Sequence, residues 1–222
     1  MHAQRTITLS DGNWTKKMRF TPGTGDQFVI KEVLIDECYA FDFQPSDVVL
    51  NLWGNIGAFD VFAFDRVKEI VTFEPDIKAY EELIWHLREN RIGNVFAYNM
   101  AVSTYTWDIP ILIGNESGHN TCVVNWDEEW IMRVNCMSIS TLLEKYHFTK
   151  IKCDIEGYEY ELFQDIVIPE SVNEMWLETH TFSPEQMKEH VALMDNFKSQ
   201  WFRVDEIRND EYNRTYLLHC KR

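Results

Sequence analysis

The feature that most restricts the fold is an alternation of strand-type and helix-type segments that begins at residue 47. Short apolar runs, which are typical of buried strands, alternate with segments whose apolar residues recur at helical spacing. We predict strands over 48–53, 70–74, 95–102, 150–155 and 174–180, and helices over 58–67, 76–90, 138–146, 158–166 and 183–199. Strands that alternate with helices form a parallel sheet covered on both faces, so the fold class is α/β.

The end of the chain departs from this alternation. Two predicted strands, 201–207 and 214–220, are joined only by the short polar turn RNDEYN. Parallel strands need a crossover of a dozen or more residues, so this pair must be antiparallel. Residues 47–222 should therefore form a mostly parallel sheet with an antiparallel terminal hairpin. Residues 1–46 are predicted to be a β-rich N-terminal segment, in which 27–35 is either a strand or a short helix.

Charge and composition argue against several classes of partner. The 222 residues carry a formal net charge of −15, and no basic cluster is visible that could bind nucleic-acid phosphates or an anionic membrane surface. No apolar run is long enough for a transmembrane helix. The five cysteines contain no CxxC pair and lie mostly among apolar neighbours. We therefore expect a cytoplasmic protein with reduced thiols and without nucleic-acid or membrane partners.

Four segments should meet at one edge of the predicted sheet, because each follows a strand. They are 53–57, 73–75, 99–101 and 154–157. In a doubly wound sheet, ligands bind outside the carboxyl ends of the strands, where the strand order reverses. The first segment contains two glycines, which allow the backbone to approach a ligand. A nicotinamide fingerprint would need a third glycine, so a NAD-dependent oxidoreductase is the less favoured alternative.

The order and spacing of these segments resemble those of the FkbM-type S-adenosylmethionine-dependent methyltransferases. The resemblance extends from about Asp26 to His180 and is carried by DQFVIKEVLIDECYAF, VVLNLWGNIGAF, VTFEPDIKAYEELIWHLREN, NMAVS, IKCDIEGYEYELF and WLETH. The family's KxDxEGxE pattern is matched by Lys152, Asp154, Glu156, Gly157 and Glu159. The resemblance implies a Rossmann-like class I methyltransferase fold and transfer of a methyl group to a hydroxyl of a saccharide or small metabolite.

The resemblance also implies where S-adenosylmethionine would bind. The matched positions are Asn51, Gly54, Asn55, Gly57, Glu74, Met100, Ala101 and Asp154. The glycine loop would cradle the amino-acid part of the cofactor, and Glu74 would bind the ribose. Met100 and Ala101 would flank the adenine. Asp154 would stand near the sulfonium and the acceptor.

Two positions depart from the family pattern. The family's acid before the loop is Asn51 here, which has the same shape without the charge, and the family's first glycine is Trp53. An indole where the backbone normally lies close to the cofactor should partly occlude the methionine end. These departures favour an alternative function, that of a catalytically lapsed relative serving as a binding or scaffold domain.

Two pairs of chemically active residues lie at predicted carboxyl ends of strands, Asp154 with Glu156 and Glu178 with His180. Residues two apart in a strand point to the same side, so both pairs could meet over the cleft. We predict Asp154, Glu156 and His180 as the catalytic residues, with His180 as the base. We assign no metal, and a divalent cation held by the four side chains is the alternative. A structural alternative is that Glu156 braces the turn at Gly157 or caps the next helix.

The remaining histidines and aromatic residues give weaker indications. His86 and His190 lie in amphipathic helices, and we predict them to be at the surface. His119 lies in the polar loop 114–121, where it could face an acceptor. Trp126 and Trp130 follow that loop and could stack on a sugar, although aromatic residues belong more often to the core.

Overall fold

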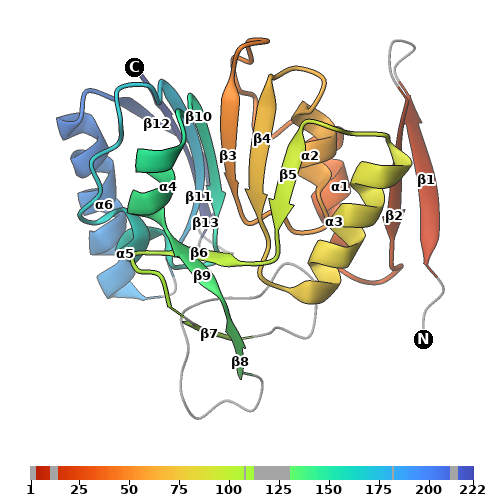
Figure 1. Ribbon diagram of the computed structural model, residues 1–222. Coiled ribbons are helices and arrows are strands. Elements are labelled where there is room, and N and C mark those ends of the chain that lie inside the picture. The colour runs from red at the N-terminus through yellow and green to blue at the C-terminus, as the bar shows by residue number, and fades with distance from the viewer. Residues whose placement is uncertain (1–3, 11–14, 108, 113–130, 182, 211–214) are drawn as a thin grey trace.

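A seven-stranded sheet forms the centre of the molecule in the computed structural model (Figure 1). The structure describes residues 4–10, 15–107, 109–112, 131–181, 183–210 and 215–222. The strand order is β12-β13-β11-β10-β3-β4-β5. The parallel strands are β3 (Val48–Leu52), β4 (Glu69–Phe73), β5 (Val95–Tyr98), β10 (Lys150–Asp154) and β11 (Glu174–His180). β13 (Thr215–Lys221) is antiparallel to both β11 and β12 (Arg203–Asp210). The predicted mostly parallel sheet with an antiparallel terminal hairpin is confirmed.

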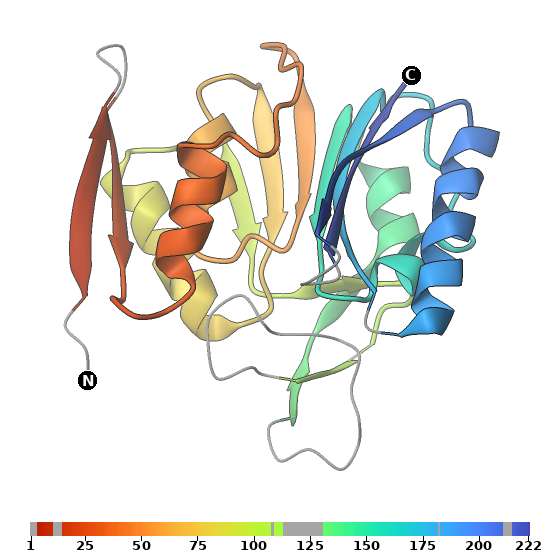
Figure 2. The same ribbon diagram turned by 180° about the vertical axis from the view of Figure 1, so that it is seen from behind.

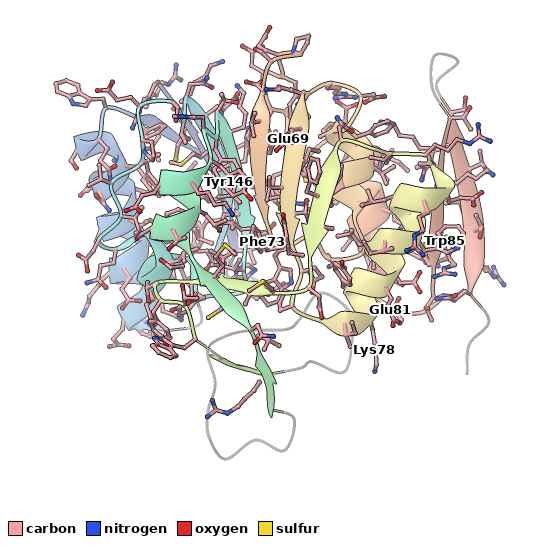
Figure 3. All side chains as sticks on the ribbon, viewed as in Figure 1. Glu69, Phe73, Lys78, Glu81, Trp85 and Tyr146 are labelled. Atoms are coloured by element: carbon pink, nitrogen blue, oxygen red, sulfur yellow. The ribbon has the colours of Figure 1, made fainter. Side chains whose placement is uncertain are left out.

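The strand order reverses at the centre of the sheet. The chain runs outwards from β3 through β4 to β5, and it then returns to place β10 on the other side of β3. Leu52 of β3 is in register with both Phe73 of β4 and Cys153 of β10, so these strands end at one edge (Figure 3). The crevice outside this edge is where a doubly wound sheet binds ligands.

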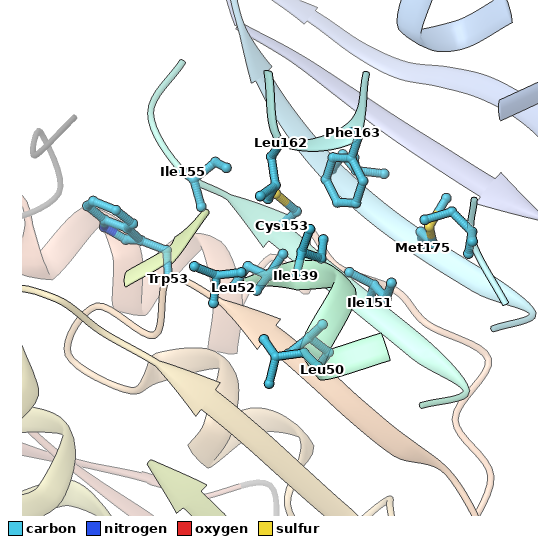
Figure 4. Close-up of a cluster of buried hydrophobic side chains, with 14 of the residues drawn as sticks. Leu50, Leu52, Trp53, Ile139, Ile151, Cys153, Ile155, Leu162, Phe163 and Met175 are labelled. Atoms are coloured by element: carbon cyan, nitrogen blue, oxygen red, sulfur yellow. The ribbon is translucent and has the colours of Figure 1, made fainter. Parts of the chain in front are cut away.

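Helices cover both faces of the sheet (Figures 1 and 2). One face carries α1 (Asp26–Leu34), α2 (Ala58–Ala63) and α3 (Ile77–Glu89), and the other carries α4 (Ile139–Lys145), α5 (Glu159–Phe163) and α6 (Pro184–Ser199). A hydrophobic cluster on the α4–α6 side joins the sheet to these helices, as Figure 4 shows for Leu52, Ile139 and Phe163. A second cluster joins the sheet to α1, α2 and the N-terminal strands. No helix in the described part of the chain is long and apolar enough to cross a membrane.

Local sequence explains where the longer helices begin. Ser183 caps α6 by accepting a hydrogen bond from the amide of Gln186, and Pro184 occupies the first turn. Asp76 caps α3 in the same way, through the amide of Lys78. Buried residues at helical spacing, including Leu83, then fix the face of α3 that packs inward.

Residues 1–46 contain a helix as well as strands. β1 (Arg5–Ser10) and β2 (Thr15–Phe20) form an antiparallel hairpin, and the stretch 27–35, left open by the sequence, lies almost wholly in α1. The hairpin packs on α3. The Arg19 guanidinium lies 4.4 Å from the centre of the Trp85 ring, which points from α3 toward β2 (Figure 3). The amide of Lys17 donates a hydrogen bond to Asn90.

The single strand predicted over 95–102 is wrong, because the chain turns at Asn99. β5 ends at Tyr98, whose carbonyl accepts hydrogen bonds from the amides of Glu74 and Met100, both at 3.0 Å. The chain then enters β6 (Ala101–Ser103), which pairs with β9 (Cys136–Ser138) outside the main sheet. One polar residue, Asn99, within the apolar run VFAYNMAV was not read as a turn.

The segment between β6 and β9 includes a further pair of strands. β7 (Ile109–Leu112) and β8 (Ile131–Val134) are antiparallel partners. The polar loop 114–121 with His119, and the tryptophans Trp126 and Trp130, lie outside the described residues. Their predicted contacts with an acceptor stay predictions.

Candidate active site

The glycine loop after β3 packs tightly against the neighbouring strand and helix. A Cβ atom added to Gly54 would lie 2.4 Å from Cγ2 of Thr72 and 2.7 Å from Cδ1 of Leu83. The amide of Gly54 donates to the carbonyl of Phe73 at 2.8 Å. Gly57 has a φ of +84°, a conformation that favours glycine. The contacts of Gly54 with β4 and α3 therefore account for a glycine at that position without any ligand.

Trp53 takes the conformation expected of the glycine that it replaces. Its φ is +76°, which is unusual for a residue with a large side chain. The indole is only 6% exposed and belongs to the hydrophobic cluster of the α4–α6 side, together with Leu52 and Ile155 (Figure 4). The same cluster includes Ala101, so it reaches the carboxyl edge of the sheet. The indole is thus part of the core at the edge where the predicted cofactor positions lie.

A buried carboxylate lies beneath the loop, although position 51 has lost its acid. Asp60 of α2 accepts hydrogen bonds from Nδ2 of Asn51, at 3.3 and 3.4 Å, and from the hydroxyl of Thr72. Burial raises the pKa of Asp60 to about 6, and the hydrogen bonds from Thr72 and Asn51 oppose this shift. The Oδ1 atom of Asn51 is buried and has no hydrogen-bond partner. The sequence signal for this group was an aspartate within the apolar run AFDVFA, which we did not assign to the site.

Glu74, the residue predicted to bind ribose, fastens the loop. One of its oxygens accepts from the amide of Asn55 at 2.6 Å, and the other accepts from the amide of Asp76 at 2.8 Å. The side chain is 1% exposed. Burial raises the pKa of Glu74 to about 8, against the lowering effect of the two amides. Both oxygens of Glu74 are therefore already engaged with backbone donors.

The two residues predicted to flank adenine lie in different surroundings. Ala101 is buried, and its amide donates to the carbonyl of Asn135 at 2.9 Å. Met100 lines a cavity of about 560 Å³, together with Thr106, Trp107, Arg133, Asn135 and Cys136. Met100 therefore borders open space, whereas Ala101 is covered by the pairing of β6.

Three of the four acid and histidine residues come together at the ends of β10 and β11. Asp154, Glu156 and His180 each offer a potential ligand atom within 4.8 Å of the others. Glu156 has a φ of +55° and lies in the turn after β10, so the strand argument that predicted its direction does not apply. Nε2 of His180 lies 3.4 Å from Glu156. Glu178 of β11 is the register partner of Asp154 of β10, but it does not belong to this group of three.

Glu159 holds the turn, a role that our structural alternative gave to Glu156. The Oε1 atom of Glu159 accepts from the amides of Ile155 and Gly157, each at 3.1 Å, and lies 3.2 Å from Nδ1 of His180. Burial disfavours a charged imidazole, but the carboxylates of Glu159, Glu156 and Asp154 outweigh it and raise the pKa of His180 to about 10. In this arrangement His180 holds a proton, so its role as a base needs a change in the surrounding charge.

Two further residues, Tyr39 and Lys152, contact Asp154 at the end of β10. Neither was among the predicted site residues. The Tyr39 hydroxyl lies 3.3 Å from Oδ2 of Asp154 and 3.5 Å from Glu178. Burial and these two carboxylates raise the pKa of Tyr39. Nζ of Lys152 donates to the carbonyl of Trp53 at 3.0 Å and lies 3.6 Å from Asp154. The sequence signals were Lys152 in the KxDxEGxE pattern and Tyr39 in the stretch before β3.

The prediction that His86 and His190 are at the surface is wrong. Both are buried. His86 Nδ1 lies 2.6 Å from the carbonyl of Ile56, and its Nε2 accepts from the amide of Arg19. His190 contacts the hydroxyl of Thr179 at 3.0 Å. Burial lowers the pKa of both histidines. The β1–β2 hairpin covers the face of α3 that carries His86, and β13 covers the face of α6 that carries His190. Helical periodicity shows which residues share a face, but not what covers that face.

The strand order is that of the Rossmann-like class I methyltransferase fold, and comparison with known proteins identifies the family. The methyltransferase FkbM domain matches residues 51–204. The chain belongs to the FkbM methyltransferase family, which in general uses S-adenosylmethionine. A search of curated proteins gave no match.

Solved structures support the fold. An FkbM methyltransferase from Methylobacillus flagellatus is 14% identical with a TM-score of 0.58, over 85% of this chain and 47% of its own. This chain thus spans about half the length of that protein. Precorrin-6y C5,15-methyltransferase from Geobacter metallireducens is 11% identical with a TM-score of 0.52, over 85% of this chain and 87% of its own. A dimethyladenosine transferase from Plasmodium falciparum is 12% identical with a TM-score of 0.50, over 89% of this chain and 60% of its own.

Proposed function

We propose that the protein transfers the methyl group of S-adenosylmethionine to a hydroxyl of an uncharged saccharide or similar polyhydroxylated metabolite. The observation that carries this proposal is a groove whose lining begins at Gly157, the neighbour of Glu156 in the Asp154–Glu156–His180 group. The groove has a volume of about 610 Å³, within the usual range for small-molecule sites. It is lined by Gly157, Tyr158, Tyr160, Glu161, Gln164, Gln186, Glu189, Ala192, Leu193 and Asn196.

The lining of the groove suits a neutral acceptor with many hydroxyls. Amide side chains donate and accept hydrogen bonds, as hydroxyls do, and carboxylates accept them. Two tyrosines supply apolar rings with a polar edge. Both charged side chains in the lining, Glu161 and Glu189, are acidic, so an anionic acceptor would be repelled. The net charge of −15 opposes a nucleic-acid acceptor for the same reason.

The predicted cofactor residues suit the nucleoside half of S-adenosylmethionine. Glu74 follows β4, and each of its oxygens has a second lone pair that could accept a ribose hydroxyl. Met100 borders a cavity that would receive a base. The methionine half fits less well, because Trp53 stands where the family has glycine. When bound, the cofactor would supply an electrophilic methyl group on its sulfonium.

The chain's own residues would orient the acceptor and receive its proton. Asp154 would hold the acceptor hydroxyl near the sulfonium, because it lies at the end of β10 and is half-buried. Glu156 stands beside it and would accept the proton, and His180, which already holds one, would orient Glu156 through Nε2. The groove between α5 and α6 would bind the rest of the acceptor.

The test is transfer of a labelled methyl group from S-adenosylmethionine to three classes of acceptor: neutral oligosaccharides, uronic-acid oligosaccharides and RNA. We expect transfer to the neutral class alone and loss of transfer in Asp154→Asn. Gln186→Ala, in the groove, should raise KM with little change in kcat. Preferred methylation of RNA or of the acidic sugars would overturn the proposed acceptor.

A second candidate function, binding without catalysis, is favoured by the buried indole of Trp53 and the missing acid at Asn51. Calorimetric titration with S-adenosylmethionine, S-adenosylhomocysteine and NAD separates the two. Binding of the first two ligands together with methyl transfer supports the enzyme. Binding of saccharide without binding of either cofactor form would support the lapsed relative instead.

A further inference from the structure

Tyr39 reaches the candidate site from a part of the chain that precedes the FkbM domain match. It follows α1, whereas the match begins at residue 51. Its side chain is 3% exposed, and its hydroxyl lies 3.3 Å from Oδ2 of Asp154 and 3.5 Å from Oε2 of Glu178. These two carboxylates are register partners on β10 and β11. The N-terminal segment therefore contributes a side chain to the edge of the sheet where the candidate site lies.

The ring of Tyr39 is held by packing, so its hydroxyl has little freedom to move. The ring packs edge-on against Phe59 of α2, with the ring centres 5.9 Å apart. Nζ of Lys152 lies 5.3 Å from the centre of the Tyr39 ring. The carbonyl of Tyr39 accepts a hydrogen bond from the amide of Phe41 at 2.9 Å. Packing of this kind fixes the direction in which a side chain donates its hydrogen bond.

The Tyr39 hydroxyl is a donor toward the two carboxylates. Burial raises the pKa of Tyr39, and the carboxylates of Asp154 and Glu178 raise it further, so the hydroxyl keeps its proton. One proton serves one carboxylate at a time, and Asp154 is the nearer of the two. Lys152 lies 3.6 Å from the same oxygen of Asp154, Oδ2. In the described part of the chain, the contacts of this carboxylate with Tyr39 and Lys152 are thus both made by Oδ2.

We propose that Tyr39 is a positioning residue for methyl transfer: together with Lys152 it holds Oδ2 of Asp154 and leaves Oδ1 to accept a hydrogen bond from the acceptor hydroxyl. This inference rests on the proposed function, in which Asp154 orients that hydroxyl. The attacking oxygen must lie in line with the methyl group, and a displacement of about 1 Å can cost on the order of a hundredfold in rate. A carboxylate held through one oxygen is restricted in rotation, so it can fix the position of that hydroxyl.

The first test is a measurement of stability, which needs neither cofactor nor acceptor. Tyr39→Phe keeps the ring and removes only the hydroxyl. Thermal unfolding of the full-length chain should show that this change lowers Tm less in an Asp154→Ala background than in the parent, because the two groups are coupled. In a Glu178→Ala background the effect should persist.

The second test is methyl transfer to neutral oligosaccharides. Tyr39→Phe should lower kcat at least about tenfold, with little change in KM or in the affinity for S-adenosylhomocysteine, because the ligands still bind but the acceptor is poorly oriented. The matched control is Tyr80→Phe, which removes a part-buried hydroxyl of α3 that donates to the carbonyl of Ala97. It should leave kcat unchanged.

The two tests separate a wrong inference from a wrong acceptor. The inference is overturned if the Tm effect of Tyr39→Phe is the same with and without Asp154, or depends more on Glu178. An unchanged kcat in Tyr39→Phe, or an equal loss in Tyr80→Phe, would also overturn it. Transfer to RNA in place of saccharides would overturn the proposed acceptor alone, provided that Tyr39→Phe lowers kcat for RNA.

Discussion

The two halves of the site end neighbouring strands of the same sheet, yet they differ in how their polar groups are satisfied. The loop after β3 is fastened within the protein: Glu74 accepts the amide of Asn55, Lys152 donates to the carbonyl of Trp53, and Gly54 packs on β4. The turn after β10 instead gathers carboxylates around one histidine. The polar groups of the loop after β3 are therefore bonded mainly to backbone, whereas those of the turn after β10 are mainly ionisable side chains that face one another.

The largest test of this contrast is Glu74→Ala, which removes the fastening of the loop. Glu74 serves two part-buried amides, and each of them left without an acceptor should cost about 1 kcal/mol or more of unfolding free energy. The variant should also bind S-adenosylhomocysteine more weakly. Urea unfolding and calorimetry measure the two effects. Glu81→Ala, an exposed acid on α3 (Figure 3), is the matched control. If Glu74→Ala and Glu81→Ala are equally stable, Glu74 does not hold the loop after β3 in place.

A second substitution tests whether Gly54 is set by packing. In Gly54→Ala the new methyl group would lie 2.4 Å from Thr72 Cγ2 and 2.7 Å from Leu83 Cδ1. Overpacking of this kind should lower the unfolding free energy by about 1–3 kcal/mol. Gly93→Ala provides the comparison, because a Cβ there meets nothing within 4 Å. If chemical denaturation finds the two alanine variants equally stable, the packing explanation fails.

The pH dependence of stability tests the carboxylate beneath the loop. The pKa of Asp60 is raised to about 6, so the folded state binds its proton more tightly than the unfolded state does. The resulting stability is fully present below the ordinary pKa near 4 and is lost as pH rises through about 6, with a slope of about 1.4 kcal/mol per pH unit. Asp60→Asn should remove this slope, because its amide imitates the protonated acid and does not titrate. Parallel slopes for parent and variant between pH 4 and 6 would contradict the shift.

The smallest expected effect concerns Trp53 and Asn51, where the sequence departs from the family. The double variant Trp53→Gly, Asn51→Asp should bind S-adenosylmethionine about tenfold more tightly, or about 1.4 kcal/mol, if the indole occludes the methionine end. Trp201→Gly is the control for the backbone strain that any change to glycine relieves at a positive φ. Trp201 also has a positive φ, of +70°, but it is 88% exposed. Calorimetry that shows micromolar binding by the parent and no gain in the double variant would make Trp53 a core residue only.

Much of the fold followed from the sequence, because apolar runs and helical periodicity record which faces are buried. The parallel strands, the terminal hairpin and the start of α6 at Ser183 were all predictable from local patterns. The turn at Asn99 was not, since its hydrogen bonds join residues from separate strands. The burial of His86 was equally invisible, because the hairpin that covers it lies far away in the chain.

The candidate site was predictable in position and less so in detail. The ends of β10 and β11 were expected to bring Asp154 and His180 together, and they do. The bracing role of Glu159 depends on a turn in which Glu156 has a positive φ, and no residue pattern signals this conformation. The contacts of Tyr39 require the tertiary packing of the N-terminal segment.

The pairing of β3 with β10 has a consequence for the order of folding. The contact between Val48 and Thr149 joins residues 101 positions apart in the chain, whereas β3, β4 and β5 are close together in sequence. Bringing distant segments together costs more chain entropy than closing short loops, and such contacts slow folding. We expect the β3–β4–β5 half to assemble first and the seam with β10 to close later. The candidate site straddles that seam, so its two halves would meet late in folding.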